Sequence, residues 1–137
     1  ENEAVNLILS SFAGRARKKE IEIKIQCAIP ADLTVSESDL CVLLSNALEN
    51  ALHACVSLAA EGRSCEIDVN FYERNKHLFL QVVNDCKAPI KFQNGIPVSD
   101  MEGHGIGVQS ICAIVQRYGG VFSFAEKDGK FTLRLSL

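Results

Sequence analysis

Two asparagines spaced four residues apart are the first residues in this sequence whose types could do chemistry. Asn46 and Asn50 lie within the segment 36–60, and His53 follows in the same segment. At about 100° per residue of helix, these three side chains fall within about 60° of one another. Because Asn is a poor helix former, such aligned amides indicate either a solvated helix face or a ligand site. In a ligand site, an amide oxygen could bind Mg²⁺, which needs few protein oxygens when phosphates supply others.

The helix that would position these residues is predicted over 36–60. Ser36 is a favourable N-cap, and Glu37 and Asp39 lie in the first turn, where the helix dipole favours acids. The apolar residues recur every three or four positions, which predicts one buried stripe. The stripe comprises Leu40, Leu44, Ala47, Leu48, Ala51, Cys55 and Leu58. The two amides would therefore project from a core helix on the side roughly opposite this stripe.

A glycine run from Gly103 to Gly107 precedes a second apolar helix, which Gly119 and Gly120 would close as a C-cap. Glycine lets the backbone approach a ligand closely, and the free N–H groups at a helix start favour an anion such as phosphate. A simple turn that leads into a helix explains the same residues, so both interpretations stay open. The run is not a Rossmann fingerprint, because no strand leads directly into it.

The composition limits the classes of function. A chain of 137 residues is long enough for one domain with a real core. Its net charge of −3 argues against a nucleic-acid binder or direct contact with a membrane surface, which require a basic face. It has no signal peptide pattern and no apolar run long enough for a membrane span. We interpret its six cysteines as small buried hydrophobes in a reducing cytoplasm, since none has the spacing of a zinc or redox pair.

Hydrophobic patterning orders the other elements. An amphipathic helix is predicted over 2–19, and the basic residues at its end suit a helix C-terminus, although such a cluster could also contact phosphates. The span 87–103 has no period, which is typical of a lid or binding loop. Strands are predicted over 21–29, 65–73, 77–85, 121–127 and 130–137, with hairpin turns at 74–76 and 128–129. This order predicts an α+β fold, a two-layer sandwich in which helices cover one face of a mixed, mostly antiparallel sheet.

Four features in this order resemble the GHKL (Bergerat-fold) ATP-binding domain of sensor histidine kinases. They are the Asn-x-x-x-Asn helix, a strand ending in Asn84-Asp85, a long irregular loop and a Gly-x-Gly-x-Gly run. The resemblance covers nearly the whole chain and is closest to the peptide-pheromone-receptor class, whose helix and glycine box are similar to LLSNALENALHAC and GHGIGVQSI. It implies that residues 20–137 form the catalytic domain. Residues 1–19 would be a lead-in helix or the tail of an upstream dimerisation-domain helix.

The resemblance also implies a site for ATP and Mg²⁺. Asn50 would be the magnesium ligand and Asn46 would lie near the phosphates, so both would be catalytic residues. Asn84 would face the adenine amino group, where most family members have Asp. Asp85 could substitute, although on a strand it should point to the opposite face. His53 is also expected to bind the cofactor, since it stands where many orthodox kinases carry Lys or Arg. The residues expected along the phosphates are Gly103, His104, Gly105, Ile106 and Gly107. Lys87–Glu102 would be the ATP lid.

Two departures from the wider family shape the expected mechanism. The first glycine box, Asp-x-Gly-x-Gly, is replaced by the residues 84–88, a loss typical of the pheromone-receptor class that predicts weaker nucleotide binding. Asn46 stands where related ATPases carry Glu, and an amide cannot act as a general base. The site would therefore transfer a phosphoryl group to an external nucleophile and not to water. Glu49, nearby on the helix, is expected to make a surface or interdomain contact.

The acceptor histidine is expected outside the chain, because His53, His77 and His104 lie in the nucleotide helix, at a strand start and in the glycine box. The expected function is the catalytic domain of a two-component histidine kinase, cytoplasmic within a membrane-anchored receptor. It would transfer the γ-phosphoryl group of ATP to a histidine on a separate dimerisation domain. Expected partners are ATP or ADP, that phosphoacceptor domain, and a response regulator through a homodimeric parent. Two alternatives are an ATP-silent docking module and a free-standing GHKL kinase or ATPase of the anti-sigma type.

Overall fold

A computed structural model describes residues 2–87, 89–98 and 104–137. The described residues form the helices α1 (Glu3–Lys18), α2 (Glu37–Ala59) and α3 (His104–Arg117). The longer strands are β1 (Glu22–Ala28), β2 (Glu66–Arg74), β3 (His77–Asp85), β6 (Val121–Lys127) and β7 (Lys130–Ser136). A short hairpin of β4 (Phe92–Gln93) and β5 (Ile96–Pro97) lies between β3 and α3. The patterning predicted all the longer elements, but α3 begins earlier than expected, so that the glycine run enters its first turn.

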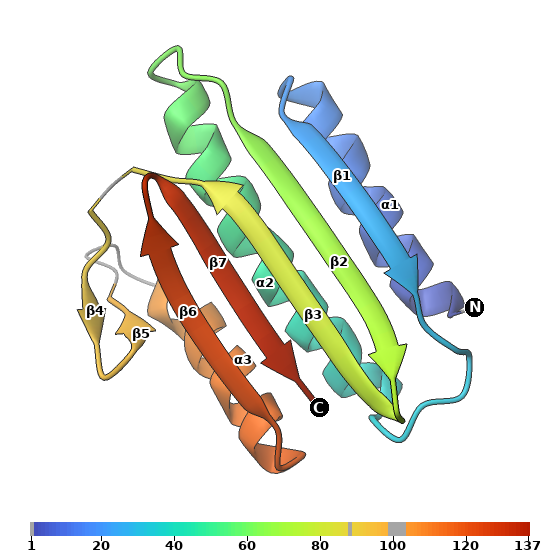
Figure 1. Cartoon of the computed structure of the whole chain (residues 1–137). Coiled ribbons are helices and arrows are strands. Elements are labelled where there is room, and N and C mark those ends of the chain that lie inside the picture. The colour runs from blue at the N-terminus through green and yellow to red at the C-terminus, as the bar shows by residue number, and fades with distance from the viewer. Residues whose placement is uncertain (1, 88, 99–103) are drawn as a thin grey trace.

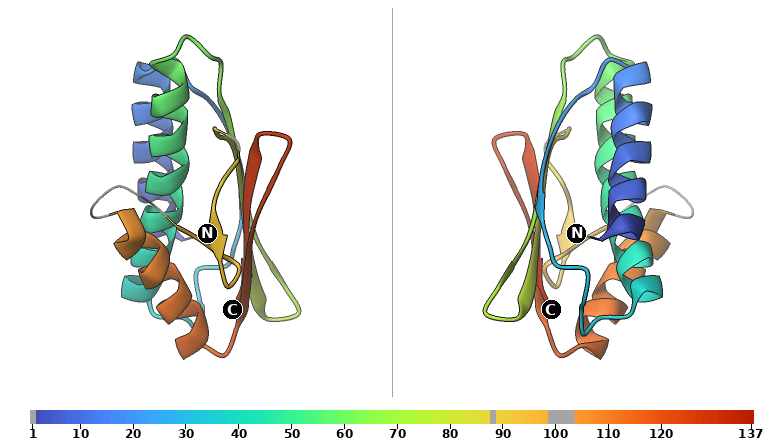
Figure 2. Two further views of the ribbon diagram at one scale, coloured as in Figure 1. Left: turned by 90° about the vertical axis from the view of Figure 1, so that its left-hand side faces the viewer. Right: turned by 90° about the vertical axis from the view of Figure 1, so that its right-hand side faces the viewer.

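The five longer strands form one mixed sheet in the order β1-β2-β3-β7-β6. β1 pairs with β2 in parallel, whereas β2–β3, β3–β7 and β6–β7 are antiparallel. The three helices lie side by side on one face of this sheet, as Figure 1 and the two edge views of Figure 2 show. The predicted two-layer α+β sandwich is therefore confirmed.

The core lies between the helices and the sheet. On β2 and β3 every second side chain is buried toward the helices, which gives the alternation seen in the sequence. The predicted stripe of α2 is buried throughout, and Leu43 and Leu52 widen it. Among the described helices, only α2 has the length and the mean hydropathy, 1.2, of a membrane span. Because its apolar residues belong to the core cluster, packing against the sheet explains that hydropathy.

Tight hairpin turns join the antiparallel strands. Asn75 and Lys76 between β2 and β3, and Asp128 and Gly129 between β6 and β7, all have positive φ, as two-residue hairpin turns require. The same geometry occurs in the span expected to be an irregular loop, where φ is 54° at Asn94 and 77° at Gly95. That expectation was wrong for residues 92–97, because the Asn-Gly turn closes the β4–β5 hairpin.

Two of the cysteines are paired. Cys55 near the end of α2 forms a disulfide with Cys65, which immediately precedes β2. The turn between them brings the two Cα atoms to 5.4 Å, within the range that a disulfide spans. The expectation of six unpaired thiols was therefore wrong for this pair, because spacing along the sequence does not show which segments a turn brings together. Of the free cysteines, Cys86 and Cys112 are buried as expected, whereas Cys27 and Cys41 are half-buried.

Candidate functional site

A cavity of about 210 Å³ opens where α2, the end of β3, the start of β7, the β4–β5 hairpin and the first turns of α3 meet. Its lining is mostly apolar, with a few polar side chains, which is the usual composition of a small-molecule site. The lining residues are Asn50, His53, Ala54, Asn84, Cys86, Ile90, Pro97, Val98, Val108 and Phe131. Three residues predicted from the sequence, Asn50, His53 and Asn84, thus come together at one cavity.

The amides of α2 meet the glycine run at the first turns of α3. A Cβ atom built on Gly107 would lie 3.2 Å from Oδ1 of Asn46 and 3.7 Å from Oδ1 of Asn50. Both asparagines are half-buried, and none of the described hydrogen bonds uses either amide. Only glycine at this position leaves these amide oxygens undisturbed. The backbone of α3 therefore comes close to two oxygen acceptors on α2.

Asn84 is the last buried residue on the helix-facing side of β3. Its side chain follows Leu78, Leu80 and Val82 on the helix-facing side and is 3% exposed. Its Nδ2 donates a hydrogen bond to the backbone carbonyl of Asp85 at 2.9 Å. This bond fixes the amide with Oδ1 as the available acceptor, the role expected for a residue that faces an amino group. Phe131, the register partner of Asn84 on β7, lines the cavity beside it.

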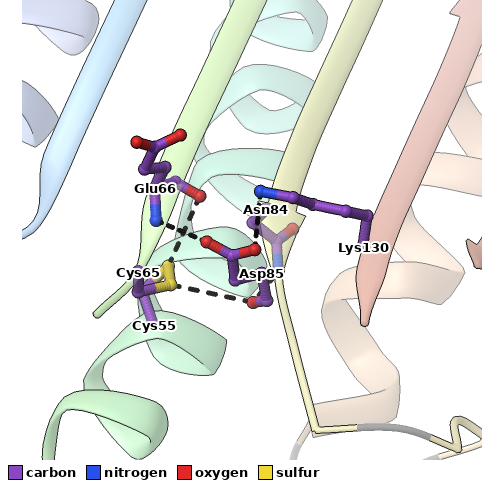
Figure 3. Close-up of a disulfide and its surroundings, with 6 residues drawn as sticks. All are labelled: Cys55, Cys65, Glu66, Asn84, Asp85 and Lys130. Atoms are coloured by element: carbon purple, nitrogen blue, oxygen red, sulfur yellow. Dashed lines mark hydrogen bonds and ion pairs between the residues drawn. A yellow bond between two sulfur atoms is a disulfide. The ribbon is translucent and has the colours of Figure 1, made fainter. Parts of the chain in front are cut away.

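Asp85 points to the other face of the sheet, as strand geometry predicted. Its Oδ1 forms an ion pair with Nζ of Lys130 at 2.6 Å, and its Oδ2 accepts a hydrogen bond from the backbone N–H of Glu66 at 2.8 Å (Figure 3). Partial burial raises the pKa of this carboxyl, but the bonds from Lys130 and Glu66 outweigh it and hold the pKa below its usual range. The Asp85 side chain is not among the residues that line the cavity, and its cofactor-binding role stays a prediction.

Glu49 is held away from the cavity by α1. Both of its oxygens contact the guanidinium of Arg15, Oε1 at 2.7 Å and Oε2 at 3.3 Å. The expected surface contact of Glu49 is confirmed. This pairing also gives one residue of the basic run of α1 a structural partner, since Arg15 further lies over the ring of Phe12 at 4.7 Å.

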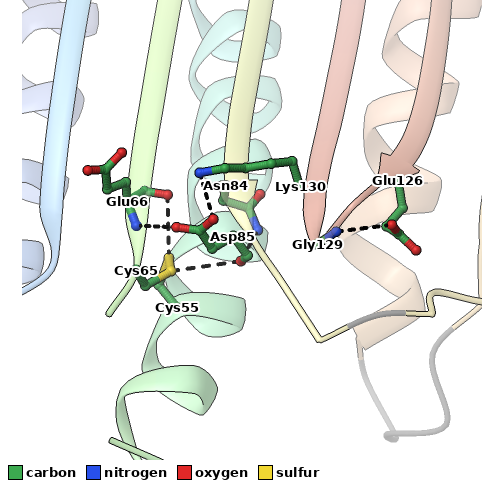
Figure 4. A network of polar contacts seen from close by, with 8 residues as sticks. All are labelled: Cys55, Cys65, Glu66, Asn84, Asp85, Glu126, Gly129 and Lys130. Atoms are coloured by element: carbon green, nitrogen blue, oxygen red, sulfur yellow. Dashed lines mark hydrogen bonds and ion pairs between the residues drawn. A yellow bond between two sulfur atoms is a disulfide. The ribbon is translucent and has the colours of Figure 1, made fainter. Parts of the chain in front are cut away.

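The β4–β5 side of the cavity is tied to the β6–β7 hairpin. Oε1 of Glu126 accepts from the backbone N–H of Ile90 at 3.4 Å, and its Oε2 accepts from that of Gly129 at 3.3 Å; Figure 4 shows the second contact. The rings of Phe92 and Phe131 stack with centroids 6.4 Å apart. Phe131 and Glu126 were not predicted from the sequence, because they reach the site only through sheet pairing. The alternation of β7 would have placed Phe131 on the helix-facing side with Leu133 and Leu135.

Several predicted residues lie at or beyond the limits of the described structure. Gly103 and part of the span 87–102 fall outside the described residues. His104 and Gly105 are described only as backbone in the first turn of α3. Ile106 is 67% exposed and is not among the residues that line the cavity. No cluster of His, Cys, Asp or Glu suited to a metal occurs among the described residues, so a cation here would rely on amide oxygens and on its ligand.

Comparison with known proteins agrees with this architecture. The family model of the GHKL domain matches residues 35–137. The nucleotide-free catalytic domain of the histidine kinase ThkA superposes with a TM-score of 0.73 at 16% identity, covering 98% of this chain and 91% of that one. The mycobacterial sensor histidine kinase MprB gives a TM-score of 0.64 at 17% identity, covering 98% and 93%. Full-length ShkA in complex with AMPPNP gives 0.68 at 16% identity, covering 97% of this chain and 28% of that one.

A search of curated protein sequences finds no match. At such low identities the solved structures show a shared fold and nothing finer. The family match, which covers most of the chain, shows that the chain belongs to the GHKL domain family.

Proposed function

We propose that this chain is the ATP-binding catalytic domain of a histidine kinase. In this proposal the cavity takes ATP, and the phosphoryl group passes to a histidine on a separate dimerisation domain. A response regulator would then receive it within the signalling system of the parent protein. The similarity of residues 43–55 and 103–111 to the peptide-pheromone-receptor class supports placing the parent in that class.

One observation carries the proposal: Gly107 packs against Asn46 and Asn50 at one side of a cavity whose other side is Asn84. The buried amide of Asn84 offers an acceptor suited to the amino group of adenine. The first turn of α3 has backbone N–H groups without helical partners, which suit phosphates. In this proposal the end of the cavity at Asn84 would be the base-recognising end, and the end at the first turn of α3 would be the phosphate-binding end.

The residues present also fit a magnesium ion bound with the nucleotide. Asn50 would supply one amide oxygen, and the phosphates would supply others, as Mg²⁺ prefers. The ion would neutralise charge on the phosphates during transfer. Asn46 would position the phosphates, and the apolar lining from Val108, Ile90 and Val98 would exclude water. Residues 87–102 would form the lid over the nucleotide.

The acceptor is expected to be a protein group and not water. The position for a general base carries the amide Asn46, and Glu49 is engaged by Arg15 on the α1 side. Positioning and charge neutralisation supply most of the catalysis in phosphoryl transfer. An isolated domain with this site should thus hold ATP without hydrolysing it quickly.

Calorimetry with ADP and ATP, with and without Mg²⁺, tests nucleotide binding. We expect binding that is stronger with Mg²⁺ and that loses this dependence in Asn50→Ala. Asn70→Ala is a matched control, because Asn70 lies on β2 in the register that faces away from the helices. Equal affinity of wild type and Asn50→Ala, with and without Mg²⁺, would contradict the role of Asn50. Absence of any nucleotide binding would favour the docking module.

Labelled ATP tests the transfer step. The isolated chain should gain no stable label and release little free phosphate, whereas a supplied dimerisation domain of the parent should become labelled. Stable label on the isolated chain would place the acceptor within these residues. Rapid phosphate release would indicate an ATPase, and Asn46→Glu would then be the comparison that shows what a general base adds at this position.

A further inference from the structure

The disulfide lies directly behind the base-recognising end of the cavity. Cys55 follows Ala54, which lines the cavity, on the same turn of α2. Cys65 leads into β2, whose Ile67 is the register partner of Asn84. The bridge therefore connects the helix that carries Asn50 and His53 to the strand next to Asn84, as Figure 3 shows. Nothing in the proposed phosphoryl transfer uses it.

A second contact links the bridge to Asn84. Sγ of Cys65 lies 3.8 Å from the backbone carbonyl oxygen of Asp85, the same oxygen that accepts from Nδ2 of Asn84 at 2.9 Å. A disulfide sulfur carries no hydrogen, so in the bridged protein this sulfur packs against the carbonyl without donating to it. A Cys65 thiol would add an S–H donor to that oxygen. The oxygen that orients the Asn84 amide is therefore sensitive to the state of Cys65.

From these contacts we propose that the Cys55–Cys65 bridge is a thiol–disulfide exchange site that sets the nucleotide affinity of the cavity, the bridged form binding more tightly. This inference rests on the proposed function, since it concerns the regulation of the same site. The co-reactant is a dithiol reductant.

The exchange balances as a two-electron reaction. A thiolate of the dithiol attacks Sγ of Cys65, the bond between Cys55 and Cys65 breaks, and Cys55 leaves as a thiolate that takes up a proton. The second thiol of the reductant then displaces Cys65, so that the reductant ends as a disulfide and the protein as two thiols. Of the two residues, Cys65 is the less completely buried, at 6% exposure against 0% for Cys55, and it follows the exposed turn 61–64.

The direction of the effect follows from packing. Two unbonded sulfurs must separate to van der Waals contact, and both are buried, so their neighbours have to give way. The neighbours include Ala54 in the cavity wall and the Asp85 carbonyl that holds Asn84. Breaking the bridge also frees the end of α2 from β2, and a site that is less preorganised binds more weakly. We expect roughly fivefold weaker binding after reduction, which corresponds to about 1 kcal/mol.

The other thiols are poor substitutes for the bridge partners. Burial, followed by the nearby carboxylates of Glu126 and Asp85, raises the pKa of the Cys86 thiol, so it stays protonated. Cys41 lies on α2 far from the bridge and is half-buried. Its replacement in Cys41→Ser therefore gives a matched control for the loss of one sulfur from the same helix.

The test compares the oxidised and reduced wild-type chain. Mass spectrometry after alkylation should count four free cysteines in the oxidised protein and six after treatment with a dithiol. Calorimetry with Mg-ADP should give roughly fivefold weaker binding in the reduced form. Cys41→Ser should keep this difference, whereas the double variant Cys55→Ala/Cys65→Ala cannot form the bridge and should bind Mg-ADP with one affinity, whether or not the dithiol is present.

A nucleotide-free readout separates this inference from the proposed function. The side-chain amide resonances of Asn84 should shift on reduction in wild type and Cys41→Ser, but not in the double variant. Six alkylated cysteines without reductant, or equal affinities together with unmoved Asn84 resonances, would overturn the inference. Shifted resonances without nucleotide binding in either form would overturn the proposed function and the effect on affinity, and would leave only the contact between bridge and amide.

Discussion

The two ends of α3 meet the rest of the molecule in different ways. At its start, Gly107 approaches two side-chain amides on α2. Past its end, a Cβ on Gly120 would overlap the backbone carbonyl oxygen of Ser136 and lie 3.2 Å from Val115. Both positions need glycine, but for different reasons. A side chain at Gly107 would crowd movable side chains at the cavity, whereas one at Gly120 would crowd the backbone of a strand. Glycine thus serves a candidate ligand site at one end and the integrity of the fold at the other.

Polar groups follow the same division. At the C-terminal end of α3, Tyr118 donates to Oδ2 of Asp39 at 2.6 Å, and Arg117 pairs with its Oδ1 at 2.8 Å. The backbone N–H of Ser36 donates in turn to the Tyr118 hydroxyl at 3.1 Å. These groups are satisfied by one another. At the start of α3, the amides of Asn46 and Asn50 take part in none of the described hydrogen bonds, so they are open to solvent or to the ligand proposed above. Functional sites commonly forgo such internal pairing.

The largest effect is expected from Gly120→Ala. The added methyl meets backbone and not a flexible side chain, so the α3–β6 connection or the end of β7 must move. The free energy of unfolding should fall by about 3 kcal/mol or more, measured by denaturant unfolding. Gly14→Ala on α1 is the control, because nothing lies within 4 Å of its Cβ position. A midpoint equal to that of wild type would show that the two ends of α3 are not as different as proposed.

Gly107→Ala should separate binding from stability. Alanine favours a helix over glycine by up to about 1 kcal/mol, which offsets the contact of 3.2 Å with Asn46. Stability should therefore change by less than about 1 kcal/mol. The affinity for Mg-ADP should fall about tenfold, because the amides of Asn46 and Asn50 are displaced from their positions. Calorimetry beside thermal unfolding measures both quantities, and unchanged affinity would remove Gly107 from the site.

The sequence predicted the fold well because its signals are local. Alternation fixed the strands, Ser36 fixed the start of α2, and the glycines at 119–120 marked the end of α3, where the N–H of Gly120 bonds to the carbonyl of Val115 at 2.9 Å. Asn50 was singled out because two aligned amides conflict with the helix propensity of their segment, and Asn84 through the resemblance to the GHKL domain; both line the cavity.

What the sequence missed depends on long-range pairing. Phe131 reaches the cavity through its register with Asn84, and Cys65 reaches Cys55 through a turn that carries no cysteine signal. The β4–β5 hairpin is different, because Asn94-Gly95 is a local turn signal that was present and overlooked. Its strands are only two residues long, too short for alternation to show.

Tyr118→Phe should weaken the structural end of α3 alone. It removes the hydrogen bonds to Asp39 and from Ser36 while keeping the ring. The melting temperature should fall by roughly 3 °C, and the affinity for Mg-ADP should stay unchanged. The bond from Tyr118, countered by desolvation and reinforced by Arg117, keeps the pKa of Asp39 below its usual value. Stability from a lowered carboxyl pKa is lost as pH falls through the folded pKa, so the difference between variant and wild type should shrink in acid.

The smallest effect is expected from Lys130→Met, which removes the ion pair with Asp85 on the sheet face opposite the cavity and keeps an apolar stem. Because Lys130 is about half exposed, the loss of stability near neutral pH should be below about 1 kcal/mol, and salt should reduce it.

The pKa of Asp85 is lowered, so its contribution to stability is present above the unfolded pKa and is lost as pH falls through the folded one. The bond to Asp85 raises the pKa of Lys130, so that contribution is present below the unfolded pKa and is lost as pH rises through the folded one. The unfolding temperature of the variant should therefore differ from that of wild type by a constant amount between these limits, and the difference should disappear at both extremes of pH.

Nucleotide affinity should not change, since the Asp85 backbone carbonyl, and not its carboxylate, contacts Asn84. A weaker affinity in Lys130→Met would mean that the open face of the sheet also controls the cavity, and that the division between structural and ligand-binding regions is less sharp than the two ends of α3 indicate.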